Sequence, residues 1–152
     1  MPLSPQELSD RTEIHDTLVR YAVAIDTRQF DLLADVFTPD AQIDYTTSGG
    51  PADAFPRIRM WLEEALAPFS SYQHALANTT YRFEGSDVAH TRTYFLNPMA
   101  HAREDGSLHM FTVYGYYVDK LVRTAEGWRI TERREEQELL VGELPPGLQI
   151  PE

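Results

Sequence analysis

The patterning of the chain changes at Pro68, and this change constrains the fold more than any other feature of the sequence. Before Pro68, apolar residues recur at the three- and four-residue spacing of amphipathic helices. After it, long segments rich in Thr, Val and aromatic residues are separated by short turns that contain Gly. Helices followed by a run of antiparallel strands are typical of an α+β fold.

Three helices are expected in the first part of the chain. The first starts at the entry signals in residues 4–7, or at a second signal formed by Asp10 and Glu13, and ends near Asp26. The Thr38-Pro39-Asp40 sequence is expected to stop the second helix. The second and third helices are predicted over residues 30–37 and 54–67, with a short strand over residues 41–45 between them.

Four strands are expected after Pro68, and they suit a meander. The turn signals lie at residues 84–87, 104–107 and 125–127, so the strands are predicted over residues 72–83, 88–102, 108–123 and 128–139. The tail from Gly142 is irregular, and we expect it to be ordered as a lid or by a partner chain. A strongly curved sheet with helices wrapped on one face would leave a conical cavity.

The composition limits the classes of function. The length of 152 residues suits one domain, residues 1–152, with a core over about 8–140 and a tail over 142–152. The hydrophobic fraction of 42% can supply a core and also line a cavity. The net charge of -11 argues against nucleic acid or anionic membrane as a partner, and it disfavours strongly anionic substrates.

Cellular location is predicted from two missing features. The first residues contain no basic and apolar leader segment, and no apolar run is long enough to span a bilayer. We therefore expect a soluble, cytoplasmic protein. The chain has no Cys, which excludes disulfides, thiolate metal sites and cysteine nucleophiles.

Asp26 and His74 are the residues most indicative of chemistry. An Asp beside a His is a simple device for removing a proton from carbon at neutral pH. If the fold brings them together, the protein is an acid–base enzyme without a cofactor. The alternatives are that Asp26 only terminates a helix and that His74 is a buried histidine bonded to backbone.

Tyr21 lies five residues before Asp26, which is about 140° around an α-helix from it. Both side chains reach one cavity only if the helix ends or bends between them. The alternative for Tyr21 is core packing. A metal site is not predicted, because the other histidines lack the spacing of a zinc site: His15, His90, His101 and His109.

Several short motifs resemble one known group of proteins. They are residues 14–22 (IHDTLVRYA), Asp26, Phe30-Asp31, residues 37–41 (FTPDA), His74 with Asn78, and residues 127–130 (GWRI) followed by Arg133. This set resembles the nuclear-transport-factor-2-like superfamily and, within it, the SnoaL-like domains, over residues from about 8 to 140. The resemblance implies a cone-shaped α+β barrel, in which three or four helices wrap a curved, mixed, mostly antiparallel sheet.

The resemblance also implies a class of activity. The nearest-looking members are lyases: bile acid dehydratase, scytalone dehydratase and hexachlorocyclohexane dehydrochlorinase. The bile acid dehydratase and the dehydrochlorinase have an Asp and a His at a spacing similar to that of Asp26 and His74. The bile acid dehydratase also has a Tyr that matches Tyr21, where the dehydrochlorinase has a Lys, so Tyr21 favours the dehydratases. A functional Asp of the bile acid enzyme falls near Asn97, which cannot exchange a proton as Asp does but can hydrogen-bond a hydroxyl or carbonyl.

Strand parity and the resemblance together indicate residues of a pocket wall, although ordinary core packing is the alternative for the aromatic ones. The substrate-binding candidates are Asn78, Phe95, Asn97, Val113, Tyr117 and Arg133, the last of which could hold an acyl oxygen or a carboxylate. The rest of the charged segment 132–138 is expected to be a solvated strand face. Tyr114 and Tyr116 have the opposite parity and are expected to face helices or another subunit.

These observations predict a lyase without cofactor or metal that acts on a small, mostly apolar, cyclic substrate. Asp26 would orient His74, His74 would remove a proton, and Tyr21 with Asn78 or Asn97 would stabilise the oxygen that gains charge. An isomerase, a polyketide cyclase, a passive ligand-binding protein and a β subunit of a ring-hydroxylating dioxygenase are the alternatives. A homo-oligomer is expected, a trimer ahead of a dimer.

Overall fold

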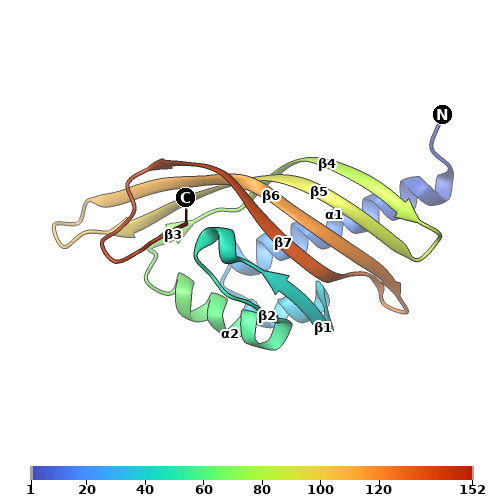
Figure 1. Cartoon of the computed structure of the whole chain (residues 1–152), viewed down its shortest axis with the longest axis horizontal. Helices are drawn as coiled ribbons and strands as arrows, with labels where there is room; N and C mark the ends of the chain where they lie inside the picture. The colour runs from blue at the N-terminus through green and yellow to red at the C-terminus, as the bar shows by residue number, and fades with distance from the viewer. Residues whose placement is uncertain (1, 152) are drawn as a thin grey trace.

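The computed structural model describes residues 2–151. It contains two α-helices, two short 3-10 helices and seven strands (Figure 1). In chain order these are α1 Pro5–Asp26, η1 Phe30–Asp35, β1 Phe37–Asp44, η2 Thr46–Ser48, β2 Ala52–Ala54, α2 Phe55–Leu66, β3 Ser71–Tyr72, β4 Ala75–Glu84, β5 Val88–Ala102, β6 Leu108–Thr124 and β7 Gly127–Gly142.

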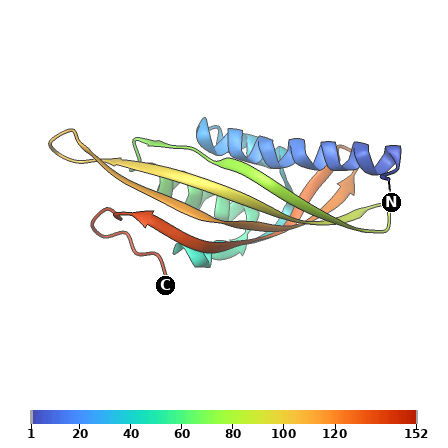
Figure 2. The ribbon, with the colours of Figure 1, turned by 90° about the horizontal axis from the view of Figure 1, so that it is seen from above.

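The strands form one sheet in the order β2-β1-β7-β6-β5-β3, with β4 also paired to β5. The β1–β7 pair is parallel and the other pairs are antiparallel. Figures 1 and 2 show that β5, β6 and β7 are long and curved, and that α1 runs along one face of the sheet. The structure confirms the predicted α+β fold, with a mostly antiparallel curved sheet and helices on its inner face.

Helix α1 begins and packs as its sequence predicts. The Ser4 hydroxyl accepts a hydrogen bond from the Glu7 backbone N–H at 3.1 Å, and Pro5 occupies the first turn, where no N–H is required. The apolar stripe of the helix is buried in the core: Ile14, Leu18, Tyr21 and Ile25. The helix therefore presents Tyr21 to the interior and ends at Asp26.

The sheet alternates between an inner and an outer face. Along β6 the buried side chains include Phe111, Val113, Tyr117 and Leu121, whereas Tyr114 and Tyr116 lie on the opposite face. Helix α2 adds Phe55, Ile58, Leu62 and Leu66 to the same core cluster. The inner face of the sheet and the two helices therefore enclose a single apolar interior.

Two predicted elements differ in the structure. The chain that was expected to be helical as far as residue 37 forms only a short 3-10 helix, because β1 starts at Phe37, which pairs with Ile130 of β7. The predicted strand over residues 72–83 is interrupted, and His74 lies in the connection between β3 and β4. In this connection the Gln73 N–H donates to the Pro98 carbonyl at 3.1 Å.

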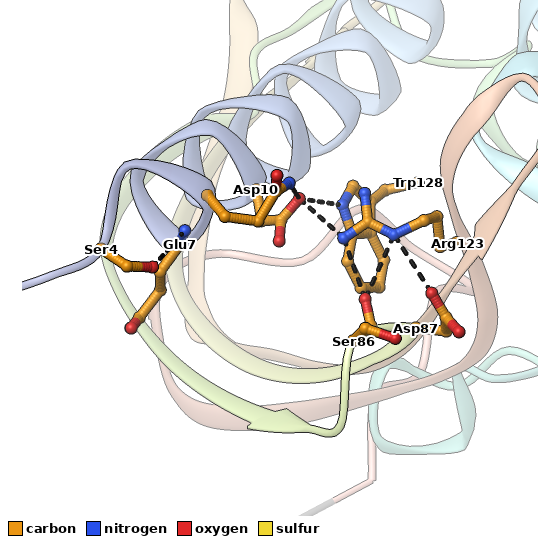
Figure 3. A network of polar contacts seen from close by, with 8 residues as sticks. Ser4, Glu7, Asp10, Ser86, Asp87, Arg123 and Trp128 are labelled. Atoms are coloured by element: carbon orange, nitrogen blue, oxygen red, sulfur yellow. Dashed lines mark hydrogen bonds and ion pairs between the residues drawn. The ribbon is translucent and has the colours of Figure 1, made fainter.

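The N-terminal end of α1 is fixed to the sheet by a polar network (Figure 3). Asp10 accepts hydrogen bonds from the Arg123 guanidinium at 2.8 Å and from the Trp128 indole N–H at 3.2 Å. Arg123 also donates to the Ser86 carbonyl at 2.9 Å. This network joins α1 to both hairpins at that end of the sheet. Within residues 2–151, no helix combines the length and apolar character needed to cross a membrane.

Candidate active site

A cavity of about 120 Å³ lies between α1, α2, the inner face of the sheet and the C-terminal tail. Its wall is mainly apolar, with a few polar groups at one side. The lining residues are Tyr21, Tyr45, Ser48, Trp61, Leu62, Ala65, Leu66, Phe69, His74, Asn97, Met99, Phe111, Val113, Tyr117, Glu135, Leu148 and Ile150. Leu148 and Ile150 belong to the irregular tail, so the tail forms part of the cavity wall.

The structure brings Asp26 and His74 together. His74 Nδ1 lies 2.7 Å from Asp26 Oδ1, and the His74 side chain is only 6% exposed. With the carboxylate as acceptor, Nδ1 carries the hydrogen, and Nε2 keeps a lone pair that can accept a proton. Asp26 does not line the cavity but lies behind the imidazole, so the helix needs no bend between it and Tyr21.

The residues around the dyad hold the end of α1 against the β3–β4 connection. The Tyr72 hydroxyl donates to the Ile25 carbonyl at 3.1 Å. Arg28, which has a positive φ of 58°, donates to the Leu66 and Phe69 carbonyls at 3.2 and 2.6 Å. Its guanidinium also lies 4.7 Å from the centre of the Tyr72 ring. These contacts fix the segment that carries Asp26 next to the segment that carries His74.

Two phenols form a hydrogen-bonded pair at the cavity. The Tyr21 and Tyr45 hydroxyl oxygens are 2.8 Å apart, and both side chains are buried. Burial raises the pKa of the Tyr21, Tyr45 and Tyr117 phenols well above their ordinary value, so all three stay protonated near neutral pH. In the pair one hydroxyl donates to the other, and the second hydrogen remains for a bound oxygen atom.

Arg133 does not line this cavity. Its side chain is fully buried, and it donates from Nε and from the terminal nitrogen Nη2 to the two Asp119 oxygens at 2.7 and 2.8 Å. The guanidinium carbon lies 4.2 Å from the centre of the Tyr21 ring and 4.1 Å from that of Tyr117. Arg133 is therefore placed behind the phenols that line the cavity, where it supports their rings.

Two other predicted wall residues also lie away from the cavity surface. Asn78 is exposed, because the register of β4 against β5 shifts between Leu76 and Thr79 and breaks the parity that the sequence suggested. Phe95 is buried but is not among the lining residues, and its ring stacks on Tyr117 with 4.4 Å between the centres. The other three wall candidates line the cavity: Asn97, Val113 and Tyr117.

Glu135 is a cavity residue that the sequence interpretation missed, because it was assigned to a solvated strand face. It lies on β7 and is only 8% exposed. The pairing of β6 with β7 shifts register between Lys120 and Leu121, so the parity that buries Trp128 and Ile130 is reversed beyond the shift. The sequence analysis predicted that Arg133 faces the cavity. Because side chains two residues apart on a strand point to the same side, this prediction would also have placed Glu135 on the inner face.

The arrangement combines the parts of a proton-transfer site. His74 offers a basic nitrogen, the phenol pair offers a hydrogen-bond donor, and Glu135 is a buried carboxyl group in the same cavity. The buried Asn97 Oδ1 and Ser48 Oγ atoms have no hydrogen-bond partner within residues 2–151, and both residues line the cavity. In the same described part of the chain, no group of three or more His, Asp or Glu residues is arranged to hold a metal ion.

Comparison with known proteins identifies the family. The model of the SnoaL-like domain matches residues 6–134. An uncharacterised protein of Mycobacterium tuberculosis is 46% identical over 134 residues, which make up 88% of each chain. A Novosphingobium aromaticivorans structure, provisionally described as an aromatic ring hydroxylase, is 30% identical with a TM-score of 0.79, and the match covers 93% of this chain and 96% of that one.

More distant structures share the fold. One is a Novosphingobium aromaticivorans protein provisionally described as a scytalone dehydratase, with a TM-score of 0.82 at 17% identity and 97% of each chain covered. Another is a type 2 hexachlorocyclohexane dehydrochlorinase, with a TM-score of 0.76 at 19% identity, covering 93% of this chain and 97% of that one. The neighbours of this fold therefore include proteins described as a dehydratase and as a dehydrochlorinase.

Proposed function

Because the chain belongs to the SnoaL-like domain family, whose model matches residues 6–134, we propose that it is a cofactor-independent lyase. Its substrate is a small, mostly apolar, cyclic molecule with a leaving group β to an acidic C–H. The reaction is a β-elimination of the dehydratase type.

The observation that supports this proposal most directly is the hydrogen bond between Asp26 and His74 at the edge of an apolar cavity. A base that removes a proton from carbon needs a lone pair directed at the substrate and a partner that stabilises its protonated form. His74 Nε2 meets the first need, and the Asp26 carboxylate at Nδ1 meets the second. The apolar walls exclude water, which strengthens the interaction between the two side chains.

In the proposed reaction, His74 Nε2 takes the proton from the carbon next to an electron-withdrawing group such as a carbonyl. The electron pair moves toward the carbonyl oxygen, and the free hydrogen of the Tyr21–Tyr45 pair stabilises the developing negative charge. The pair then returns to form the C=C bond as the leaving group departs. A positioned proton-transfer group of this kind contributes about 10²–10⁴-fold to the rate.

Isomerases and polyketide cyclases share the first of these steps, so they remain the nearest alternatives. A non-catalytic role as a binding protein or as a dioxygenase β subunit is the other alternative. Such a role needs neither an Asp–His pair nor an open cavity beside it. The 2.7 Å contact and the cavity together favour a catalytic role.

The proposal can be tested with 3-hydroxycyclohexanone, a single-ring β-hydroxy ketone whose dehydration gives the ultraviolet-absorbing cyclohexenone. His74→Ala is expected to lower kcat/KM for this dehydration by at least about 10²-fold, with unchanged circular dichroism. The matched control is His15→Ala, which removes an exposed histidine from α1. A wild-type protein that dehydrates the ketone no faster than His74→Ala contradicts the proposed function.

A further inference from the structure

Glu135 is a second ionisable group in the cavity, and the proposed steps do not use it. Among the described residues that line the cavity, it is the only one with a carboxyl group. It enters from β7, whereas His74 enters from the connection between β3 and β4. The cavity therefore has a carboxyl group and an imidazole on separate wall segments.

The backbone around Glu135 is fixed, and its carboxyl group is not used in the fold. The Thr47 hydroxyl donates to the Glu135 carbonyl at 2.9 Å and accepts from the Gln137 N–H at 3.3 Å, which ties β7 to η2. Within residues 2–151, no hydrogen bond or ion pair involves the Glu135 carboxyl oxygens, although the residue is only 8% exposed. A mostly buried carboxyl group that lines a cavity is costly to ionise, and such groups are common at functional sites.

Arg133 is the cation on the same face of β7 as Glu135, whereas Arg134 points to the exposed face, but Arg133 does not neutralise Glu135 by direct pairing. Two of its nitrogens donate to Asp119, so its charge is already compensated by another carboxylate. Burial raises the pKa of Glu135 to about 7, and the positive charge of Arg133 opposes this rise only in part. At neutral pH the carboxyl group is therefore able both to hold and to release a proton.

We propose that Glu135 is the general acid of this cavity, and that the leaving group of the substrate is a hydroxyl which Glu135 protonates as it departs. This inference rests on the proposed lyase function and adds to it the group that protonates the leaving hydroxyl. A halide leaves as an anion and needs no proton, whereas a hydroxyl leaves readily only as water. A buried proton donor in the cavity thus indicates an oxygen leaving group.

The step balances in atoms and charge. His74 Nε2 takes a proton from the α-carbon, and the C–H electron pair moves to the enolate oxygen and returns to form the C=C bond. The C–O bond breaks toward oxygen, and the Glu135 proton goes to that oxygen to give water. The site is left with a protonated His74 and an ionised Glu135, and transfer of one proton from His74 to Glu135 through water restores both groups.

The protonation of Glu135 can be measured without a substrate. Carbon-13 labelling of glutamate carboxyl groups, with Glu135→Gln used to assign the signal, gives the titration of Glu135 by nuclear magnetic resonance. A midpoint near 7 is the expected result. A midpoint below about 5, in the range of an ordinary glutamate, overturns the proposal.

The leaving-group claim is tested with two probes on one ring, 3-hydroxycyclohexanone and 3-chlorocyclohexanone, after subtraction of the uncatalysed elimination. Glu135→Gln keeps the shape of the side chain but cannot act as the acid. It is expected to lower kcat for loss of water by at least about 10²-fold and kcat for loss of chloride by less than about threefold. The control is Glu138→Gln, which makes the same substitution at an exposed position of the same strand. It should leave both rates as in the wild type.

The outcomes separate the two proposals. Equal loss of both eliminations in Glu135→Gln indicates a structural role and overturns the general acid. If His74→Ala eliminates water and chloride as fast as the wild type, the proposed lyase function fails instead. In that case the carboxyl titration alone decides whether Glu135 is a poised proton donor.

Discussion

Asp26 binds His74 through both the ring and the backbone of the histidine. Asp26 Oδ1 lies 2.7 Å from Nδ1, and the carboxylate also accepts the His74 backbone N–H, with Oδ2 at 2.9 Å. The same side chain therefore places the β3–β4 connection and sets the ring tautomer. Because the ring is fixed by the group that would also stabilise its protonated form, the base is held ready before any substrate binds.

The first prediction concerns Asp26→Asn. An amide can donate to Nδ1, which would place the ring hydrogen on Nε2 and remove the lone pair from the cavity side. We expect kcat for dehydration of 3-hydroxycyclohexanone to fall by about 10²-fold or more. Asp16→Asn, an exposed change on the same helix, is the control. A loss of less than about threefold in a folded Asp26→Asn protein would show that the carboxylate is not needed.

The sequence predicted most of the elements because these depend on local signals, and it predicted the contact of Asp26 with His74 through a family resemblance. The entry signal at Ser4 and the stripe of Ile14, Leu18 and Tyr21 determine α1, and the predicted turn at 84–87 lies in the connection between β4 and β5. The spacing of Asp26 and His74 could be compared with that of a known family. Alternation along β6 likewise predicted that Val113 and Tyr117 face inward.

The positions that could not be predicted depend on irregular strand pairing. The register shift in β4 turns Asn78 outward, and the shift between β6 and β7 turns Glu135 inward. A shift of one residue reverses every later side chain, and no local signal in a single sequence marks where it occurs. Tyr45 was missed for a related reason, because it lies just beyond the end of β1, where strand parity gives no direction.

The second prediction concerns the network at the other end of α1 (Figure 3). Burial alone would raise the pKa of Asp10, but hydrogen bonds from Arg123 and Trp128 outweigh it and hold this pKa below its ordinary value. Asp10→Ala leaves the buried Trp128 N–H without its acceptor and removes one partner of Arg123, which keeps its bonds to Ser86 and Asp87, so we expect the free energy of unfolding to fall by about 2–3 kcal/mol. Urea denaturation measures this change, and Asp16→Ala on the exposed face of α1 should stay within about 0.5 kcal/mol of the wild type.

The third prediction follows from the pKa of Glu135, which burial raises to about 7 from an ordinary value of 4.5. The folded state holds this proton more tightly than the unfolded state, so the associated stability is present below pH 4.5 and is lost as the pH rises through 7. Glu135→Gln has no proton to lose. Between pH 5 and pH 8, its free energy of unfolding should therefore rise relative to the wild type by roughly 2–3 kcal/mol.

Denaturant titrations of both proteins at the two pH values test this prediction. The difference between the two proteins cancels the contribution of the other titrating groups. A difference that stays constant with pH would mean that Glu135 titrates as an ordinary exposed glutamate.

The fourth prediction concerns the outer face of the sheet. Apolar side chains gather there in neighbouring strands, with Leu96, Tyr114 and Leu139 in register across β5, β6 and β7. Tyr94 and Tyr116 lie beside them, with 4.7 Å between their ring centres. Contiguous exposed apolar surface of this kind marks association sites. We expect a homo-oligomer, a trimer ahead of a dimer.

Multi-angle light scattering at micromolar concentration measures the mass. Leu139→Glu puts a charge on this face and should shift the mass toward the 17.4 kDa of one chain. Val19→Glu adds the same charge to the exposed side of α1, and this variant should have the same assembly mass as the wild type. A wild-type mass equal to one chain would contradict the expected assembly.

The last prediction concerns what the cavity accepts. Its volume of about 120 Å³ suits one ring, and aliphatic and aromatic side chains make up most of its wall, while the whole chain has a net charge of -11. Leu148 and Ile150 close one side, so a larger polycyclic ligand would have to displace the tail.

In a thermal-shift assay, cyclohexanone and the monocyclic terpenoid carvone should stabilise the protein, whereas adenosine monophosphate and glucose 6-phosphate should not. A ligand at 100 times its Kd adds about 2.7 kcal/mol, which is a shift of roughly 5–10 °C for a chain of this size. A chain ending at Gly142 should extend the range to steroids, because the tail no longer limits the cavity. Stabilisation by the phosphorylated compounds and none by the rings would show that charge, and not apolar shape, determines binding.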